Sequence, residues 1–288
     1  MDPKKFLFIT HLTPAAKRSE TRAGLLRLMQ QSLEDQTYIH WKSLRIGEEE
    51  FDNGKIKIVN RFSVKTLFDL YAREDLKALI DWADYIVKVD DDDIVLPHTL
   101  ELASQLEFDC YCDRFHTFYD FSTGRTTQQS RSWIAATCIH KKEHAITLNK
   151  GTGIAENFSQ SLFYGEHGVD WIAYYHSKKI VYAHPTTPVY VRILSPTSQS
   201  AGAKIYPVSS TRDADMNAYR NYVRRFGSWN SYPIRNWSAY PAQLKILWER
   251  FSSSDFLIPE RTSRTLQMKE FARYWVFRIT GIRRQPMS

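Results

Sequence analysis

Four consecutive aspartates, Asp90 to Asp93, directly follow a short, largely apolar segment at 85–89 that is typical of a β-strand. We call them the acidic tetrad. Four adjacent carboxylates repel one another unless a cation neutralises them. Mg²⁺ and Mn²⁺ prefer carboxylate oxygens, and Mg²⁺ is usually held by one or two carboxylates together with substrate phosphates. The tetrad therefore predicts a site for a divalent cation that binds the phosphate groups of a substrate. The alternative is a helix N-terminal turn, where aspartates favour the helix dipole ahead of 94–97.

The segments around the acidic tetrad alternate between strand and helix patterns. Strand-like segments lie at 6–9, 41–46, 55–59 and 85–89, and leucines at helical spacing mark 21–36. This alternation predicts a mostly parallel central sheet with helices on both faces. Ligands of such open sheets bind outside the carboxyl ends of the strands, which is where the acidic tetrad follows its own strand.

The rest of the chain predicts further elements and a division into two parts. Pro97 suits the first turn of a helix that runs to about 106. Further strands are expected within 132–140, 180–183 and 189–194, a helix at 170–176, and a loop at 195–211. From about residue 212 the chain reads as mainly helical. We therefore expect an α/β domain at 1–211 and a helical C-terminal extension at 212–288.

Composition and charge narrow the class of protein. The 288 residues carry a net charge of +7 and 14% aromatic residues, which favours an anionic partner such as a nucleotide, an acidic lipid surface or a nucleic acid. Cys110, Cys112 and Cys138 form neither a disulfide framework nor a zinc-knuckle spacing. The apolar run at 6–9 is too short for a signal peptide, and no stretch approaches the ~20 apolar residues of a spanning helix. A cytoplasmic location is expected.

Four segments together resemble the family 2 glycosyltransferases. Residues 32–38 followed by 41–46 look like the family's first helix and second strand, and 87–97 resembles its metal-binding Asp-x-Asp segment with the downstream proline. Residues 168–173 are similar to the helix that carries the family's catalytic base, and 189–192 resembles the strand that follows. The resemblance covers residues 5 to 200, approximately.

The resemblance implies the GT-A fold, a Rossmann-like α/β domain that binds a nucleotide-sugar donor with Mn²⁺ or Mg²⁺ and generally inverts the anomeric centre. By position, Asp92 is the main metal ligand on the diphosphate, and Asp90, with Asp91 beside it, lies near the ribose or the metal. Asp170 is then the general base that deprotonates the acceptor hydroxyl. A cation can stabilise the charge that builds on the leaving phosphate, and inversion needs one base on the opposite face of the sugar.

This chain departs from the family's pattern in two places that affect the site. The second strand ends in Ile46-Gly47-Glu48-Glu49, where the family often has an Asp-rich turn that contacts the nucleotide base, so Glu48 is the candidate for that contact. Glu166 and Asp170 are separated by three residues, whereas the family's acidic pair is adjacent. Glu166 is therefore a rival for the role of base.

Several other side chains have both a functional and a structural interpretation. His184 follows a strand and is either a third metal ligand or a histidine bonded to backbone at a strand end. Arg192 either meets the diphosphate, whose geometry suits a guanidinium, or forms a surface salt bridge. Lys17, Arg18 and Arg22 lie either where phosphates approach or on a solvated helix start.

The C-terminal segment predicts a basic amphipathic helix. Apolar residues recur at 271, 275, 279 and 282 among five basic side chains. Such a helix either lies on an anionic membrane surface or docks on the protein's own core or a second subunit.

Together these patterns predict a metal-dependent enzyme that moves a sugar from a nucleotide-sugar to a hydroxyl acceptor. A bacterial surface polysaccharide or lipid-linked glycan is the expected product class, made on a glycan or lipid-linked acceptor. Peripheral contact with the inner face of the cell membrane is expected as well. One alternative is a metal-dependent nucleotidyltransferase that uses the same acidic cluster. A second is a basic nucleic-acid-binding protein, although no recognition motif is present and no nucleic acid is expected. A third is an inactive scaffold.

Overall fold

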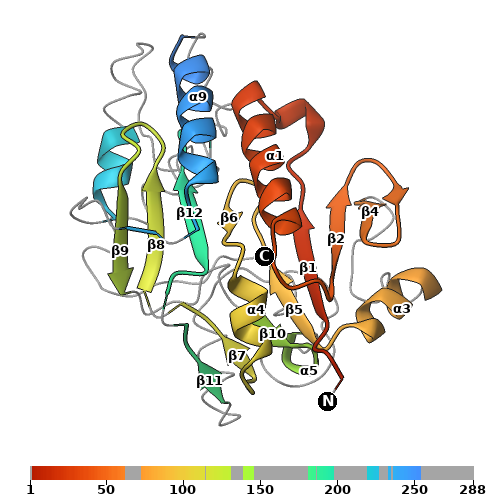
Figure 1. The fold of residues 1–288 in the computed structure, drawn as a ribbon. Helices are drawn as coiled ribbons and strands as arrows, with labels where there is room; N and C mark the ends of the chain where they lie inside the picture. The colour runs from red at the N-terminus through yellow and green to blue at the C-terminus, as the bar shows by residue number, and fades with distance from the viewer. Residues whose placement is uncertain are drawn as a thin grey trace, which may run out of the picture.

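The computed structural model describes residues 2–61, 73–113, 115–130, 139–145, 181–185, 187–197, 219–226, 233–234 and 236–253. These residues form a mixed α/β structure with an eight-stranded sheet and a separate four-stranded sheet (Figure 1). The expected α/β class is confirmed, and the second sheet is a feature that the sequence patterns did not predict.

The large sheet has the strand order β11-β7-β10-β5-β1-β2-β4-β3. Its strands are β1 (Phe6–His11), β2 (Trp41–Gly47), β3 (Phe51–Asp52), β4 (Ile56–Asn60), β5 (Tyr85–Lys88), β7 (Cys110–Tyr111), β10 (Ile139–Lys141) and β11 (Tyr182–Ala183). The central strands β5, β1, β2 and β4 are parallel, as predicted. Towards the edges, β3 runs antiparallel to β4, and β10 runs antiparallel to both of its neighbours. The connection from β3 to β4 contains Gly54 at φ +82°, which suits a tight hairpin.

Helices cover both faces of the large sheet. Successive residues of a strand point to opposite faces, so each strand contributes to two apolar cores, one on each side. Phe6 and Phe8 of β1 pack with side chains of α1 (Glu20–Glu34) and α4 (Thr99–Ser104). Leu7 and Ile9 pack on the other face with α3 (Glu74–Trp82) and α5 (Lys142–Ala145). A strand that is buried on both faces is expected to be apolar throughout, as β1 is.

The four-stranded sheet has the order β6-β12-β8-β9. Its strands are β6 (Ile94–Val95), β12 (Tyr190–Leu194), β8 (Phe115–Asp120) and β9 (Thr126–Ser130). The acidic tetrad lies between β5 of the large sheet and β6 of this one, so it marks the point where the chain crosses between sheets. The alternative of a helix N-terminal turn is therefore wrong. Pro97 also precedes its helix, which begins at Thr99, rather than lying in the first turn.

The described part of the C-terminal extension is helical and packs against the α/β core. The helix α9 (Ala239–Ser253) lies beside α1, where apolar side chains of both helices share one core (Figure 1). A Cβ atom on Gly24 of α1 would lie 2.3 Å from Leu247 Cδ2 of α9, so glycine permits this close approach. Tyr219 and Phe226 pack with Phe118 and Leu194 of the small sheet. The expected boundary at 211 and the basic segment after 253 lie outside the described residues.

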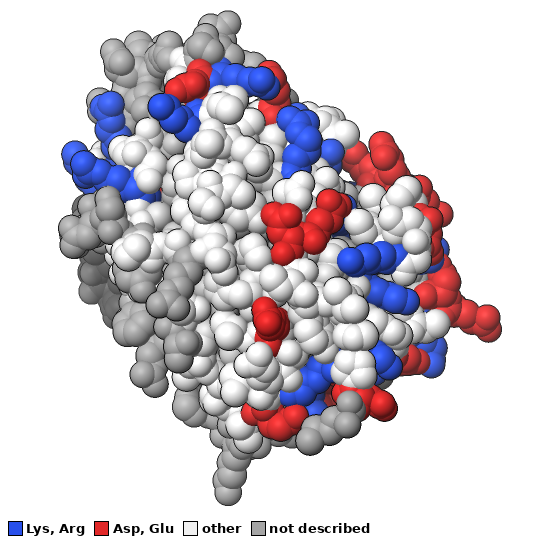
Figure 2. All heavy atoms as spheres, in the orientation of Figure 1, with Lys and Arg blue, Asp and Glu red and all other residues white. Residues whose placement is uncertain are grey.

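Charges on the face viewed in Figure 2 do not form a continuous basic surface, because Lys and Arg alternate there with Asp and Glu. Among the described residues, none of the helices has the length and apolar character needed to cross a bilayer.

Candidate functional site

The carboxyl ends of β1, β2, β4 and β5 lie at one edge of the large sheet, because these four strands are parallel neighbours. The segment after β1 is held there by its neighbours: Leu12 N–H donates to the Ile46 carbonyl, 2.9 Å away, and the Arg61 guanidinium donates to the Leu12 carbonyl. Glu48 follows β2, and its carboxylate accepts a hydrogen bond from Ala15 N–H at 2.8 Å. The structure thus places Glu48 and the acidic tetrad at the same edge, and Glu48 holds the loop between β1 and α1.

The two middle aspartates of the tetrad are bridged by one arginine. Arg22 Nη2 donates to Asp91, and Arg22 Nη1 donates to Asp92. A second contact fixes Asp91, whose Oδ2 accepts a hydrogen bond from Thr13 N–H at 2.6 Å. Arg22 is only 8% exposed, so the interpretation of this residue as part of a solvated helix start is wrong.

Arg22 reaches the tetrad from the first turn of α1. Ser19 is the N-cap of this helix, and its side chain accepts a hydrogen bond from Arg22 N–H at 3.1 Å. A positive charge in the first turn opposes the helix dipole, which favours negative charge there. This mismatch is a feature of the sequence from which an acidic partner for Arg22 could have been inferred.

The last aspartate of the tetrad holds the small sheet. Asp93 Oδ2 accepts a hydrogen bond from the Tyr190 hydroxyl at 2.6 Å, and Oδ1 accepts one from Ile193 N–H at 2.9 Å. Burial raises the pKa of Asp93 well above its usual range, with a further contribution from the charge of Asp92. Burial by itself would lower the pKa of Arg192, but the charges of Asp93 and Asp90 raise it above its ordinary value. Arg192 is thus within reach of the charges of this acidic cluster, and its contact with a diphosphate stays a prediction.

Asp92 and Asp90 have the donor atoms that suit a divalent cation. Burial raises the pKa of Asp92 to about 6, against the opposing effect of Arg22. The one hydrogen bond of Asp92 to the described residues uses Oδ2, which leaves Oδ1 for another ligand. Asp90 is partly exposed, whereas Asp91, Asp92 and Asp93 are buried. Carboxylate oxygens are the ligands that Mg²⁺ and Mn²⁺ prefer, so this pair fits such an ion.

Basic side chains surround the loop that follows β1. Arg18 Nη2 donates to the Thr13 carbonyl at 2.6 Å, and Arg61 holds the preceding residue. His11, the last residue of β1, is kept neutral, because burial and the charges of Lys88 and Arg61 lower its pKa to about 3. The edge of the sheet thus carries positive charge beside the acidic tetrad, which suits a ligand with phosphate groups.

His184 follows β11 and is bonded to backbone, as one of its two interpretations predicted. Its Nδ1 lies 2.9 Å from the carbonyl oxygen of Cys112, which is the residue that follows β7. In the strand order, β11 lies three positions from β5. At the usual strand spacing this is about 14 Å across the sheet. The structure therefore does not bring His184 together with Asp92.

Asp113 is a buried acid that sequence reasoning did not single out. It follows β7 at the same edge of the sheet as the tetrad, and its Oδ2 accepts a hydrogen bond from Val189 N–H at 3.4 Å. Burial raises its pKa well above the usual range. An acid that keeps its proton in the folded state lowers stability as the pH rises, because the unfolded chain releases that proton.

Replacement of Asp113 by asparagine is expected to stabilise the protein at pH 8 but not at pH 4. As the pH rises from the unfolded pKa of about 3.9 towards the raised folded pKa of Asp113, the free energy of unfolding of the protein falls. A neutral amide at this position carries no such penalty. The amide oxygen can still accept the hydrogen bond from Val189 N–H. Calorimetric melting temperatures at both pH values test this, with a gain of about 3 °C per kcal/mol recovered. An equal loss at both values would contradict it.

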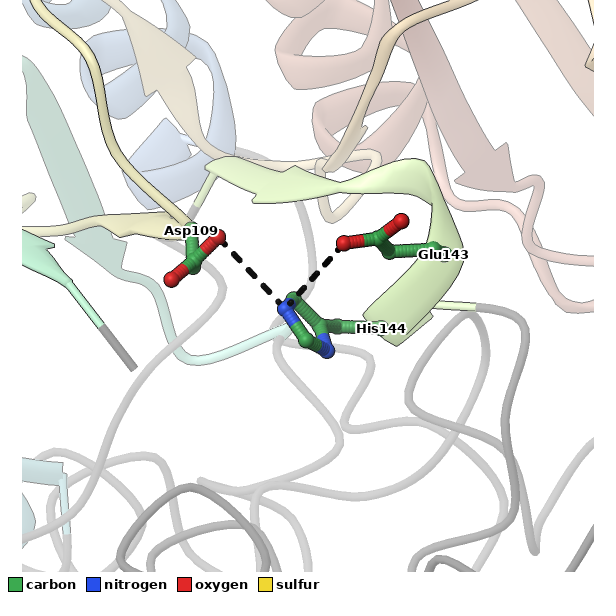
Figure 3. A group of neighbouring side chains, drawn as sticks. All are labelled: Asp109, Glu143 and His144. Carbon is green, nitrogen blue, oxygen red and sulfur yellow. Dashed lines mark ion pairs between the residues drawn. The ribbon is translucent and has the colours of Figure 1, made fainter. Parts of the chain in front are cut away.

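A second acidic group lies at the opposite edge of the sheet. Asp109, Glu143 and His144 place one possible ligand atom each within 4.8 Å of one another (Figure 3). His144 Nε2 lies 3.6 Å from Asp109 Oδ1 and 3.8 Å from Glu143 Oε1. Lys141 Nζ also lies 3.7 Å from Asp109 and 3.1 Å from Glu143. Since a lysine already balances both carboxylates, we interpret this group as an ion-pair cluster that is separate from the acidic tetrad.

No protein-family model and no curated protein sequence matches this chain. Among solved structures, the chain is similar to S. aureus TarS 1-349, with 12% identity, 88% of this chain and 73% of that chain covered, and a TM-score of 0.40. It is also similar to a protein described as a putative nucleotide-diphospho-sugar transferase from Desulfovibrio desulfuricans G20. The identity is 12%, the match covers 77% of this chain and 98% of that chain, and the TM-score is 0.35. A third similar structure is the glycosyltransferase GlyE of Streptococcus pneumoniae TIGR4. The identity is 10%, the match covers 91% of this chain and 66% of that chain, and the TM-score is 0.33.

Both candidates for the catalytic base, Asp170 and Glu166, lie outside the described residues, as does the expected helix at 170–176. Their roles therefore remain predictions from the sequence.

Proposed function

We propose that the chain is a GT-A glycosyltransferase, similar to family 2, that moves a sugar from a nucleotide-diphosphate sugar to a hydroxyl acceptor. The observation that carries this proposal is the position of the acidic tetrad. Asp90 and the uncommitted oxygen of Asp92 lie at the carboxyl edge of four parallel strands, where open α/β sheets bind their ligands. Basic residues around the β1 loop add the charge that a diphosphate requires.

Each residue of the site has a proposed task. Asp92 and Asp90 hold Mn²⁺ or Mg²⁺, and Asp90 faces the ribose side of the donor. Asp91, which was expected beside them, is buried and uses its two oxygens for Arg22 and Thr13 N–H, so its task is to support this pair. The bound ion supplies stabilisation of the negative charge on the leaving diphosphate. Glu48 is proposed to contact the nucleotide base. Arg192 keeps the tetrad's charge balanced, and His184 is left out of the metal set because of its distance in the strand order.

The reaction is proposed to proceed with inversion. Asp170, with Glu166 as the rival, takes the proton from the acceptor hydroxyl while that oxygen bonds to the anomeric carbon. The bond between the anomeric carbon and the diphosphate oxygen breaks on the opposite face of the sugar. The products are a glycosylated acceptor and a nucleoside diphosphate.

The wider setting is proposed from the sequence. Residues 1–211 form the catalytic domain, and the extension at 212–288 brings the enzyme to an anionic membrane surface on the cytoplasmic side. A glycan or lipid-linked acceptor of a bacterial surface polysaccharide would be presented there.

A thermal-shift screen of nucleoside diphosphates and their sugars tests the function. One nucleotide is expected to raise the melting temperature with Mn²⁺ present and to have little effect with EDTA, because a ligand that binds only the native state stabilises it. Incubation of the matching sugar donor with an acceptor should release nucleoside diphosphate. Release of pyrophosphate would instead support the nucleotidyltransferase, and a salt-sensitive shift with RNA or DNA alone would support nucleic-acid binding.

A further inference from the structure

Arg22 occupies the acidic tetrad with a buried guanidinium. Its side chain is 9% exposed, and the two carboxylates that it bridges, Asp91 and Asp92, are 3% and 10% exposed. It gives one nitrogen to each carboxylate rather than a fork to one of them. The single positive charge of Arg22 therefore compensates two buried carboxylates, which lie 69 and 70 residues after Arg22 in the sequence.

The two acids depend on Arg22 to different extents. Asp91 keeps a second hydrogen bond, from Thr13 N–H, on its other oxygen. Asp92 has no other hydrogen bond from the described residues, and the charge of Arg192 affects it less than the charge of Arg22 does. If Arg22 withdrew, Asp92 would be a buried, uncompensated carboxylate, which is strongly unfavourable. Asp92 is thus the residue at which another cation could take the place of the guanidinium.

We propose that Arg22 is an internal counter-ion that competes with the divalent cation for the Asp92 carboxylate, so that the ion binds as the guanidinium is released. This inference rests on the proposed function, in which Asp92 and Asp90 hold the ion. The guanidinium holds the carboxylates together in the metal-free protein. A dication brings twice the charge to the same Asp92 carboxylate, but it is repelled by Arg22 for as long as the guanidinium remains there.

Replacement of Arg22 by glutamine is expected to tighten Mn²⁺ binding by about tenfold or more, equivalent to about 1.4 kcal/mol for each factor of ten. The same variant is expected to melt at a lower temperature without metal, because two buried carboxylates lose their partner. Added Mn²⁺ should then raise its melting temperature by more than it raises that of the wild type. Binding is measured by the electron paramagnetic resonance signal of free Mn²⁺, with no nucleotide present.

Arg61→Gln is the matched control, because it removes a positive charge from the same edge of the sheet but bonds to the Leu12 carbonyl rather than to the tetrad. Its Mn²⁺ affinity is expected to stay within about threefold of the wild type, since the half-buried Arg61 guanidinium bonds to a backbone carbonyl and acts on the tetrad only through a partly screened charge. Arg22→Lys guards against misfolding of the glutamine variant. Lysine keeps the charge without the planar fork, so Mn²⁺ should bind this variant more tightly than the wild type but less tightly than Arg22→Gln.

Asp92→Asn separates failure of this inference from failure of the proposed function. Equal Mn²⁺ affinity in the wild type, Arg22→Lys and Arg22→Gln, with binding lost in Asp92→Asn, would overturn the competition and leave the metal site in place. Mn²⁺ binding that is absent in every variant, or unchanged in Asp92→Asn, would overturn both. A gain in affinity in Arg22→Gln that Arg61→Gln does not share would support the competition.

Discussion

Replacing Asp92 by alanine is expected to abolish metal-dependent sugar transfer. Asp92 is the proposed main ligand of the ion that meets the diphosphate, so its loss removes the group that stabilises charge on the departing phosphate. Loss of one such electrostatic contribution costs about 10²–10³-fold in turnover, and loss of the ion itself costs more. The measurement is nucleoside diphosphate release at saturating donor with Mn²⁺, and added Mn²⁺ up to millimolar concentration should not restore it.

Folding of this variant must be shown separately, because Asp92 is also a partner of Arg22. The guanidinium retains Asp91 when Asp92 is removed, and a cooperative thermal transition would show that the fold persists. Asp81→Ala is the matched control, since Asp81 is an exposed aspartate that pairs with Lys77 four residues earlier on α3. Such surface pairs contribute little, so this variant should keep wild-type turnover and stability. Unchanged activity in Asp92→Ala would show that the site is assigned wrongly.

Replacing Asp170 by asparagine is expected to lower turnover by about 10²–10⁴-fold while the affinity for the donor stays nearly unchanged. The carboxylate is proposed to take the proton of the acceptor hydroxyl, whereas the donor is held by residues at the carboxyl edge of the sheet. An amide has almost the same shape but cannot accept that proton. Turnover is measured under saturating substrates, and donor affinity is measured by titration of the unhydrolysed nucleotide-sugar in the absence of acceptor.

Glu166→Gln is the companion variant, because Glu166 is the rival base and is separated from Asp170 by three residues. If Asp170 is the base, Glu166→Gln should reduce turnover by less than about tenfold, as expected of a residue that does not transfer the proton. The reverse pattern would assign the role to Glu166. Loss of donor affinity in Asp170→Asn would show that this residue supports the structure of the site instead.

The elements that follow from local patterns were predictable. The strands at Phe6, Trp41 and Tyr85 and the helix α1 were all expected from apolar runs and from leucines at helical spacing. These patterns persist in the structure because β1 is buried on both faces and α1 presents one apolar stripe to the core. The placement of the acidic tetrad also followed from the sequence, because parallel strands end at a common edge whichever side chains they carry.

The pairing partners of these elements were not predictable from local patterns. The strand β6 is two residues long, too short for any periodicity, and it exists because Ile94 and Val95 meet β12 almost a hundred residues later. The antiparallel strand β10 likewise enters a sheet that alternation alone predicted to be mostly parallel.

By itself, the sequence determined that four carboxylates follow a buried strand and that a cation is needed to hold them together. Only the tertiary structure decided that Arg22 meets this need within the described chain, and that Asp93 and Asp113 hold the small sheet. The physical reason is that propensity and periodicity depend on neighbours along the chain. Compensation of buried charge depends instead on groups that folding brings together from distant segments. Because these groups are buried, an unpaired charge among them would cost much more free energy than one at the surface.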